Sequence, residues 1–242
     1  KCPNIIYMAG LKFDFVGRED FLWAMNTVAP GIVAQAFKES RIVSFSTIHV
    51  YPWSNPLQGG IDESAGPMAR PGEYSNSVVG RERTFQYYSN KFDTPGSIVR
   101  FVYAIDMRYG VMQEIANWVL NDEVIPVDTG SVNIMWQGDA LNQFAQLLTH
   151  CTTPASPINI GGPECVSVRR LAQEFGKIFG KEPKFEGEEN SSLFVNCDHA
   201  AGLMGNPVVP INPMIRWVAE WVKSGKPTYG KPSKFQIRSG KF

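Results

Sequence analysis

The chain contains two kinds of apolar pattern. Short, nearly continuous apolar runs occur at Ile5–Ala9, Arg41–Thr47, Ser97–Ala104 and in "PINIGG" at 157–162. Runs of this kind are typical of strands that are buried on both faces of a sheet. We therefore expect these four segments to be strands of a parallel sheet.

Longer segments between these strands carry apolar residues at helical spacing. The expected helices are Phe21–Glu39, Tyr74–Asn90, Val111–Asn121, Asp139–His150, Ser167–Phe179 and Met214–Lys223. Pro30 and Gly31 are expected to bend the first of them. The alternation of strands and helices predicts an α/β fold with a doubly wound parallel sheet.

Two segments lack periodicity. Residues 51–73 are rich in Pro and Gly and are expected to form a loop, and residues 226–242 are expected to be a surface tail. Ligands of parallel sheets bind at the carboxyl ends of the strands, where Gly10, Thr47 and Tyr103 fall.

Composition and residue spacing argue against some classes of function for this chain: nothing in them predicts nucleic-acid binding, membrane binding or a metal site. The 23 basic and 23 acidic residues balance, so nothing predicts a nucleic-acid or membrane surface, and no apolar run is long enough to span a bilayer. The four cysteines are scattered without Cys-x-x-Cys spacing, which predicts reduced thiols in a cytoplasmic protein. The histidines and cysteines show no zinc-ligand spacing, so we expect no metal site.

Residues 72–91 contain two tyrosines that could transfer protons. Tyr87 is followed at the fourth position by Lys91, which puts both side chains on one helix face. Tyr74 is followed at the fourth position by Val78 instead. The preceding sequence decides between the two tyrosines.

The order of these segments resembles the extended short-chain dehydrogenase/reductase family, the NAD-dependent epimerase/dehydratase group that acts on nucleotide sugars. "IIYMAG" resembles the strand that ends beside the cofactor, and "FSTIHVY" resembles the Ser-Ser/Thr-x-x-Val-Tyr segment. "DESAGPMARPGEY" resembles the acidic, proline-containing approach to the active-site tyrosine. "IVRFVYA" resembles the next strand, and "NIGGPECVSVRRLAQEFGKIFG" resembles a strand and helix of the substrate lobe. The resemblance spans residues 3–225 and depends on the order and spacing of the segments together.

The resemblance implies that Tyr74 and Thr47 occupy the catalytic positions. In the family the tyrosine begins its helix, at about the distance from the Ser/Thr that separates Tyr74 from Thr47. Tyr87 lies at the far end of the helix, where Lys91 is better explained as a cation that complements the helix dipole.

The resemblance also implies NAD or NADP as cofactor and a nucleotide-sugar-like small molecule as substrate. The implied cofactor-binding residues are Ala9, Gly10, Asn26, Ser46, Phe101 and Val102. Tyr103 and Trp136 are the implied substrate-binding residues, with core packing as the alternative for Trp136. Arg100, inside an apolar strand, is either a buried, paired cation or a site residue. A homodimer is a further expectation.

The implied fold is a Rossmann-like sheet that is incomplete at the N-terminus, with a small C-terminal α/β substrate lobe. Residues 1–110 would belong to the NAD(P)-binding domain. Residues 111–242 would be mainly the substrate lobe, with elements interleaved back into the first domain. The family's first three strands would precede Lys1, so we expect this chain to be an N-terminally truncated piece with an exposed apolar sheet edge.

Two features depart from the family. Val78 stands where the family has a lysine that lowers the pKa of the tyrosine and holds the nicotinamide ribose. Arg81 is the better candidate to replace that lysine, although its head is expected to lie one turn too far along the helix. The sequence also holds no G-x-G-x-x-G or G-x-x-G-x-x-G turn for a pyrophosphate.

Two hypotheses of function remain. The first is an epimerase, dehydratase or reductase that uses NAD(P) on a nucleotide sugar. The alternative, favoured by Val78, is a non-catalytic member of the same fold that binds a dinucleotide or sugar nucleotide. The sequence does not identify the sugar, the choice between NAD and NADP, the type of reaction or the oligomer.

Overall fold

The computed structural model describes residues 2–12 and 15–240. Its main sheet is formed by β1 (Asn4–Tyr7), β2 (Arg41–Thr47), β3 (Gly96–Phe101) and β8 (Ser156–Ile160), in the order β1-β2-β3-β8. All neighbouring pairs are parallel. The predicted α/β fold with a doubly wound parallel sheet is confirmed.

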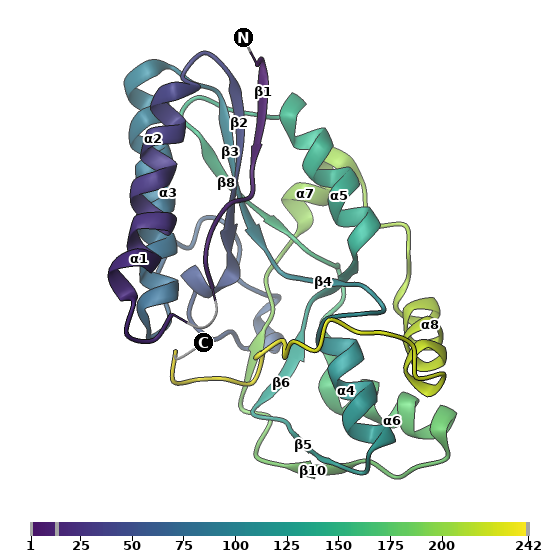
Figure 1. The fold of residues 1–242 in the computed structure, drawn as a ribbon. Helices are drawn as coiled ribbons and strands as arrows, with labels where there is room; N and C mark the ends of the chain where they lie inside the picture. The colour runs from purple at the N-terminus through teal and green to yellow at the C-terminus, as the bar shows by residue number, and fades with distance from the viewer. Residues whose placement is uncertain (1, 13–14, 241–242) are drawn as a thin grey trace.

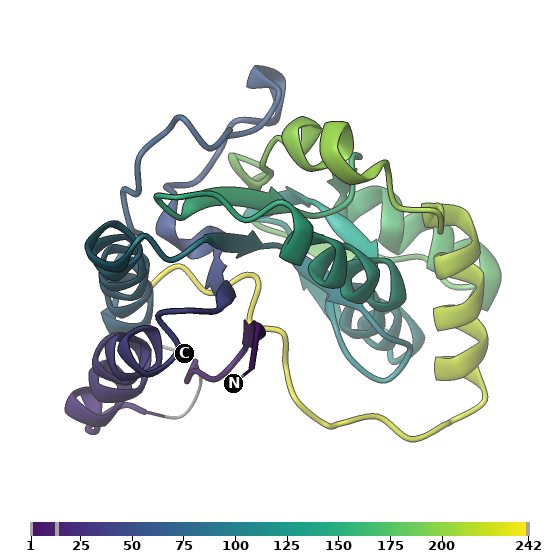
Figure 2. The ribbon, with the colours of Figure 1, turned by 90° about the horizontal axis from the view of Figure 1, so that it is seen from above.

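Helices cover both faces of this sheet (Figure 1, Figure 2). On one face lie α1 (Glu19–Trp23), α2 (Ala29–Ala36) and α3 (Glu73–Phe92), and on the other lie α5 (Gln137–Gln146) and α7 (Asp198–Met204). Successive strand residues point to opposite faces. Thus Ile42 packs with Phe85 of α3, whereas Val43 packs with Phe144 of α5.

The expected helix over Phe21–Glu39 is divided by a π-helical turn, η1 (Ala24–Val28), that precedes the expected bend. Pro30 has no N–H, so the carbonyl oxygen of Asn26 loses its usual helical donor. The Arg81 Nε atom donates to that carbonyl at 3.1 Å. The break in the helix therefore provides an acceptor for α3.

The expected strand Ser97–Ala104 is two strands. β3 ends at Phe101, and β4 (Tyr103–Ile105) pairs in parallel with β7 (Ile134–Trp136) in a separate sheet. This change of partner carries the chain from the main sheet into the second lobe.

The second lobe has α4 (Val111–Leu120), α6 (Val168–Phe179) and α8 (Ile211–Lys223) around a core that includes Ile115, Phe175 and Val218. Short strands complete it: β5 (Val124–Pro126) with β10 (Lys184–Glu186), and β6 (Thr129–Val132) between β9 (Val166–Ser167) and β11 (Ser191–Leu193). The 3-10 turns in the described part of the chain are η2 (Ile48–Val50), η3 (Pro56–Gln58) and η4 (Leu147–Thr149).

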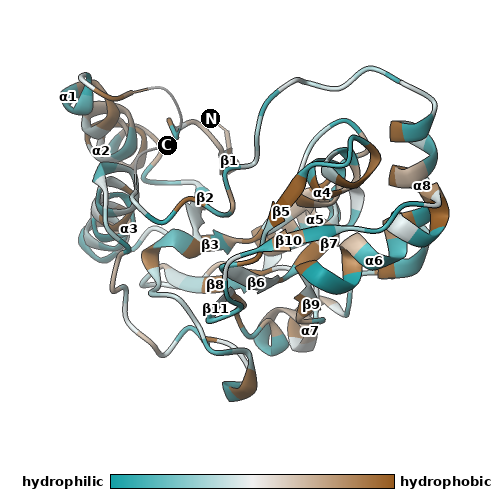
Figure 3. Cartoon of the chain, turned by 90° about the horizontal axis from the view of Figure 1, so that it is seen from below, coloured by the Kyte–Doolittle hydropathy of each residue, from teal (hydrophilic) through white to brown (hydrophobic). Residues whose placement is uncertain are grey.

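The prediction of a surface tail after residue 225 is wrong for its second half. Residues 226–234 are mainly hydrophilic (Figure 3), but Phe235 is 1% exposed and its ring packs against Tyr103 and Trp118. The Gln236 side chain exchanges hydrogen bonds with the backbone of Thr129. The segment runs from α8 back to the start of α3 (Figure 1). One buried aromatic ring among polar residues leaves no periodic pattern, which explains the error.

The expected apolar sheet edge is present. Within the described residues, β1 pairs with β2 alone, and Ile6 and Met8 beside this edge are 40% and 58% exposed. All four cysteines are free thiols, as predicted. Among the described residues, no helix combines the length and apolarity that a membrane crossing needs.

Candidate active site

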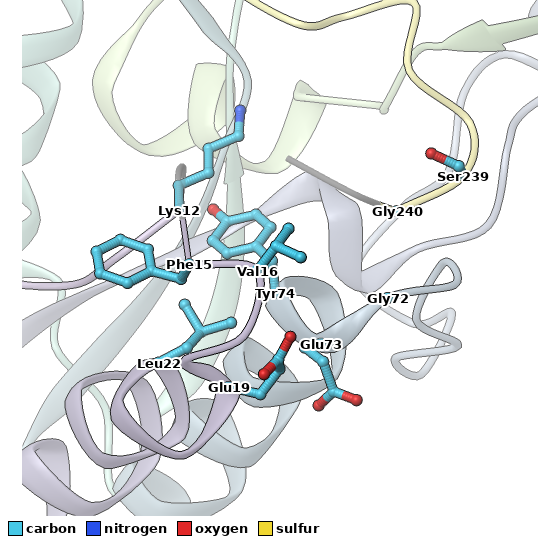
Figure 4. A pocket seen from close by; sticks show the side chains of 10 residues that line it. All are labelled: Lys12, Phe15, Val16, Glu19, Leu22, Gly72, Glu73, Tyr74, Ser239 and Gly240. Carbon is cyan, nitrogen blue, oxygen red and sulfur yellow. The ribbon is translucent and has the colours of Figure 1, made fainter.

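Three cavities meet at Tyr74, the second residue of α3, near the carboxyl ends of β1 and β2. We call them the β3 cavity (about 350 Å³, with Thr47, Tyr103 and Gln137), the β1 cavity (about 150 Å³, with Gly10 and Asn26) and the outer cavity. The outer cavity, of about 240 Å³, has Phe15, Val16 and Leu22 in its wall (Figure 4). Tyr74 and Lys12 line all three cavities.

Tyr74 and Thr47 both lie in the wall of the β3 cavity. Thr47 is the last residue of β2, is 6% exposed, and its Oγ1 atom accepts from the backbone N–H of His49 at 3.3 Å. Burial raises the pKa of Tyr74, while the hydrogen bond with Thr47 and the charge of Arg81 lower it. The net pKa is above the ordinary value, so the phenol carries its proton at neutral pH.

Asn26 connects the helical layer to the chain beyond β1. Its fully buried side chain donates to the carbonyl oxygen of Leu11 and accepts from the Leu11 N–H, both at 2.9 Å. The Arg81 Nη2 atom donates to the same Asn26 side chain at 2.8 Å, and Nη1 donates to the carbonyl of Phe45 at 3.0 Å. Asn26 and Arg81 thus hold α3, η1 and β2 together beside Tyr74.

Arg81 brings its charge to the wall of the β1 cavity. Helical side chains run back toward the helix N-terminus, and the Arg81 guanidinium reaches a place where a Cβ atom on Gly10 would meet it at 2.3 Å. The Arg81 and Tyr74 side chains line the same β1 cavity, and the charge of Arg81 lowers the pKa of Tyr74. Val78, in contrast, is 3% exposed and part of the hydrophobic core.

Arg100 is a buried, paired cation. It donates to Glu82 through Nε at 2.9 Å and through Nη2 at 2.8 Å, and the two side chains are 2% and 0% exposed. Its Nη1 atom donates to the Tyr51 hydroxyl at 2.6 Å, which in turn donates to Asn159. Ser46 donates to the Oε1 atom of Glu82, which also accepts from Arg100 Nε. This network fixes β2 and β3 below the site.

Sequence reasoning missed a group of cations around Tyr74. The Lys12 Nζ atom lies 5.8 Å from the centroid of the Tyr74 ring. Burial lowers the pKa of Lys12 to about 8, with contributions from Arg70 and Lys234. Burial likewise lowers the pKa of Arg70 to about 10, and that of His49 well below its ordinary value. Of these residues, only Lys12 could have been found from the local sequence, because it lies two residues after Gly10, at the end of an expected strand.

The structure brings together most of the residues that the resemblance implies. The β3 cavity is lined by Ser46, Thr47, Tyr74, Phe101, Val102 and Tyr103. The β1 cavity is lined by Gly10, Asn26, Ser46 and Tyr74. Ala9 and Trp136 line neither cavity, and Trp136 packs against Trp217 with ring centroids 5.4 Å apart. Tyr87 is 57% exposed and lines none of the three cavities.

No family model and no curated protein matches the sequence. Solved structures do match. UDP-glucuronic acid 4-epimerase from Bacillus cereus, in complex with UDP-glucuronic acid and NAD, superposes with a TM-score of 0.74 at 18% identity, over 91% of this chain and 75% of that chain. UDP-glucose 4-epimerase from Thermus thermophilus, in complex with NAD, gives 0.73 at 15% identity over 92% and 78%. UDP-glucose 4-epimerase from Thermotoga maritima, with UDP-glucose, gives 0.75 at 13% identity over 92% and 78%.

Sequence identities of 13–18% show that this chain and the matched structures share a fold. This chain therefore has the Rossmann-type α/β fold that these nucleotide-sugar epimerases have.

Proposed function

We propose that this chain carries the catalytic centre of an NAD(P)-dependent epimerase or dehydratase that acts on a nucleotide sugar. The observation that carries the proposal is that Thr47 and Tyr74 line the same β3 cavity, where Thr47 lowers the pKa of Tyr74. The pair lies at the carboxyl end of the sheet, where ligands of this fold class bind.

Tyr74 is the proposed acid/base. Its protonated phenol can donate to a carbonyl oxygen of the sugar, and the phenolate left behind can accept a proton from a sugar hydroxyl. Thr47 lines the same cavity and can donate a hydrogen bond to the same reacting oxygen. The two groups together would exchange one proton with one substrate oxygen.

Arg81 is proposed to supply the fixed positive charge near Tyr74. A cation favours the phenolate and so lowers the pKa of the tyrosine. Three hydrogen bonds hold the Arg81 guanidinium in place, so it is pre-organised for this role. This arrangement would replace the lysine that Val78 cannot provide.

The residues of the β1 cavity fit the nicotinamide end of a dinucleotide. Gly10, Asn26, Ser46 and Tyr74 line the cavity and would hold that end. The sequence holds no glycine-rich turn for the pyrophosphate. The residues of this chain therefore fit the nicotinamide end of the dinucleotide and not its pyrophosphate. NAD(P) held by these residues would supply hydride-transfer chemistry to the site.

Val78 favours a second candidate, a protein that binds a sugar nucleotide without turnover. A lysine at the fourth position after the tyrosine could reach the site, whereas Val78 is packed in the core. In this candidate Tyr74 and Thr47 would serve as hydrogen-bonding groups for a bound sugar.

One experiment separates the two candidates. The chain is incubated with UDP-glucose, UDP-galactose or UDP-glucuronate and millimolar NAD or NADP, and the sugars are followed by proton NMR. Formation of an epimer or of a keto sugar supports the enzyme. Saturable binding of the UDP-sugar without conversion supports the second candidate, and the absence of both refutes the proposal.

A further inference from the structure

Glu82 is a buried carboxylate that can only accept hydrogen bonds. Its side chain is 0% exposed, and the Arg100 guanidinium donates to both of its oxygens, from Nε at 2.9 Å and from Nη2 at 2.8 Å. A carboxylate paired with a guanidinium has no hydrogen to donate, and the guanidinium has no lone pair with which to accept. The direction of hydrogen bonding is therefore fixed at this pair.

The far side of the network has the same fixed direction. The Asn159 Nδ2 atom donates to the carbonyl oxygens of Ile61 and Asn196, both at 3.0 Å. Only the Oδ1 atom of Asn159 is left for the Tyr51 hydroxyl, which donates to it at 3.1 Å. The Tyr51 oxygen in turn accepts from the Arg100 Nη1 atom at 2.6 Å. Each group of the network thus has a single assignment as donor or acceptor.

Ser46, near the end of β2, is the hydroxyl through which this network reaches the cavities. It donates to the Glu82 Oε1 atom at 2.5 Å, a distance typical of a hydroxyl that donates to a carboxylate. A serine hydroxyl has one hydrogen, and this one is committed to Glu82. Ser46 is half-buried and lines both the β1 cavity and the β3 cavity. Its hydroxyl therefore offers a ligand lone pairs and no hydrogen.

Reversal of the Ser46 hydroxyl would be costly. To donate to a ligand, Ser46 must withdraw its hydrogen from Glu82, and the fully buried carboxylate would lose a donor that solvent does not replace. Donation to a charged acceptor also polarises the O–H bond, which makes Oγ a stronger acceptor. We therefore expect Ser46 to bind an N–H or O–H group and to disfavour a group that has lone pairs only.

Arg81 offers the opposite chemistry in the same cavity. Its guanidinium has five N–H groups, and three of them donate to Asn26 and Phe45. Among the described residues, the remaining N–H on Nη1 and the remaining N–H on Nη2 have no acceptor. Arg81 lines the β1 cavity, and Phe45, whose carbonyl holds Nη1 at 3.0 Å, directly precedes Ser46 in β2. The wall of the β1 cavity thus presents an acceptor and N–H donors on adjacent side chains.

We propose that Ser46 determines specificity in the β1 cavity, where its oxygen accepts from the NH2 group of a primary carboxamide while Arg81 donates to the carboxamide oxygen. A primary carboxamide carries a donor and an acceptor on one carbon atom, so it matches both side chains at once. The inference rests on the proposed function, because the carboxamide is that of the nicotinamide end of the dinucleotide.

The test compares two dinucleotides that differ in one group. In the 3-acetylpyridine analogue of NAD, a methyl group replaces the NH2 of the carboxamide, while the carbonyl oxygen and the charged ring are retained. We expect the 242-residue chain to bind NAD about three- to tenfold more tightly than the analogue, the value of one net hydrogen bond. Ligand-observed NMR titrations at millimolar concentration and pH 7 measure both dissociation constants.

Ser46→Ala should remove this preference, because the affinity for NAD falls and the affinity for the analogue does not. Ser44→Ala is the matched control. Ser44 lies two residues earlier on the same face of β2, is 1% exposed and lines a separate cavity with Phe85, so the preference should persist. An equal loss of affinity for both dinucleotides in Ser46→Ala would show a merely structural role for Ser46 and would overturn the inference.

Arg81→Met tests the other half of the carboxamide site. NAD and the analogue both retain the carbonyl oxygen, so this substitution should weaken both by the same factor, about threefold or more, and leave their ratio unchanged. Unaltered affinities in Arg81→Met would overturn the part assigned to Arg81, whereas the ratio in Ser46→Ala still decides the part assigned to Ser46.

The remaining results separate the inference from the proposed function. Equal affinity of the unchanged chain for NAD and the analogue overturns the inference and leaves the proposed function standing. A preference that persists in Ser46→Ala also overturns the inference, because the NH2 group then has another acceptor. Binding of neither dinucleotide refutes the cofactor site in the β1 cavity, and the inference fails with it. A titration with UDP-glucose then shows whether the sugar-nucleotide part of the proposed function survives.

Discussion

Arg81→Met removes the guanidinium that joins α3 to η1 and β2 and retains most of the aliphatic stem. Three hydrogen bonds are lost, to the carbonyl of Asn26 at 3.1 Å, the side chain of Asn26 at 2.8 Å and the carbonyl of Phe45 at 3.0 Å. The Asn26 side chain keeps the Leu11 N–H as donor. The Asn26 carbonyl cannot recover the ordinary helical bond, because Pro30 has no N–H.

Two buried acceptors are therefore left without a strong donor. At about 1–3 kcal/mol for each unsatisfied group, the loss is about 2–6 kcal/mol. Removal of a buried charge offsets part of this loss, so we expect the free energy of unfolding to fall by about 2–4 kcal/mol. This is a large fraction of the total stability of a domain, about 5–15 kcal/mol.

The same substitution should raise the pKa of Tyr74. Burial raises that pKa and Arg81 opposes this effect, so without Arg81 the phenolate loses a stabilising charge. Urea unfolding at pH 7 measures the change in stability. Titration of tyrosine labelled with carbon-13 at Cζ, with the Tyr74 resonance assigned by its loss in Tyr74→Phe, measures the pKa.

Arg83→Met is the matched control. Arg83 is exposed on the same helix, and its guanidinium donates to Gln86. We expect a change within about 0.5 kcal/mol and no effect on Tyr74. The reasoning is refuted if Arg81→Met and Arg83→Met unfold at the same urea concentration and Tyr74 titrates identically in both.

Further predictions concern the buried ion pair of Glu82 and Arg100, residue 78, the binding of NAD(P) and the open edge of β1. Glu82→Gln leaves Arg100 without its carboxylate and should cost about 3–5 kcal/mol in urea unfolding; a cost below about 1 kcal/mol would contradict the buried pair. Val78→Lys should lower the pKa of Tyr74 by about one or more, measured by the same NMR titration, and an unchanged pKa would show that position 78 does not reach the site. Calorimetry should show NAD and NADP binding weaker than micromolar, because the sequence has no glycine-rich turn; micromolar binding would contradict this. The open edge of β1 should give concentration-dependent self-association in sedimentation, reduced by Ile6→Lys; a monomer at all concentrations would refute it.

The main sheet could be predicted because its strands have continuous apolar patterns. The pattern over Arg41–Thr47 matches β2 residue for residue, since both faces of that strand are covered by helices. The pattern over Ser97–Ala104 could not show that the strand changes partners after Phe101, because both parts are apolar. The short strands of the second lobe, of two to four residues, are too short to show a period.

The site could be predicted only in part, for a related reason. The distance along the chain from Thr47 pointed to Tyr74, and both side chains line the β3 cavity. The position of Arg81 depends on the acceptor that Pro30 creates in another helix, and this contact is not visible in the sequence of α3. The cluster of Lys12, Arg70 and Lys234 combines three distant segments, so no local pattern could reveal it.

The measurement that tests the central claim most directly is the conversion of a UDP-sugar by Tyr74→Phe and Tyr87→Phe variants beside the unchanged chain. Proton NMR follows the sugar at millimolar NAD or NADP. We predict that Tyr74→Phe lowers the rate by a factor of about 10² or more, the usual contribution of a general acid/base, and that Tyr87→Phe has little effect. If Tyr87→Phe abolishes conversion while Tyr74→Phe leaves it intact, Tyr74 is not the acid/base and the assignment of Thr47 fails with it.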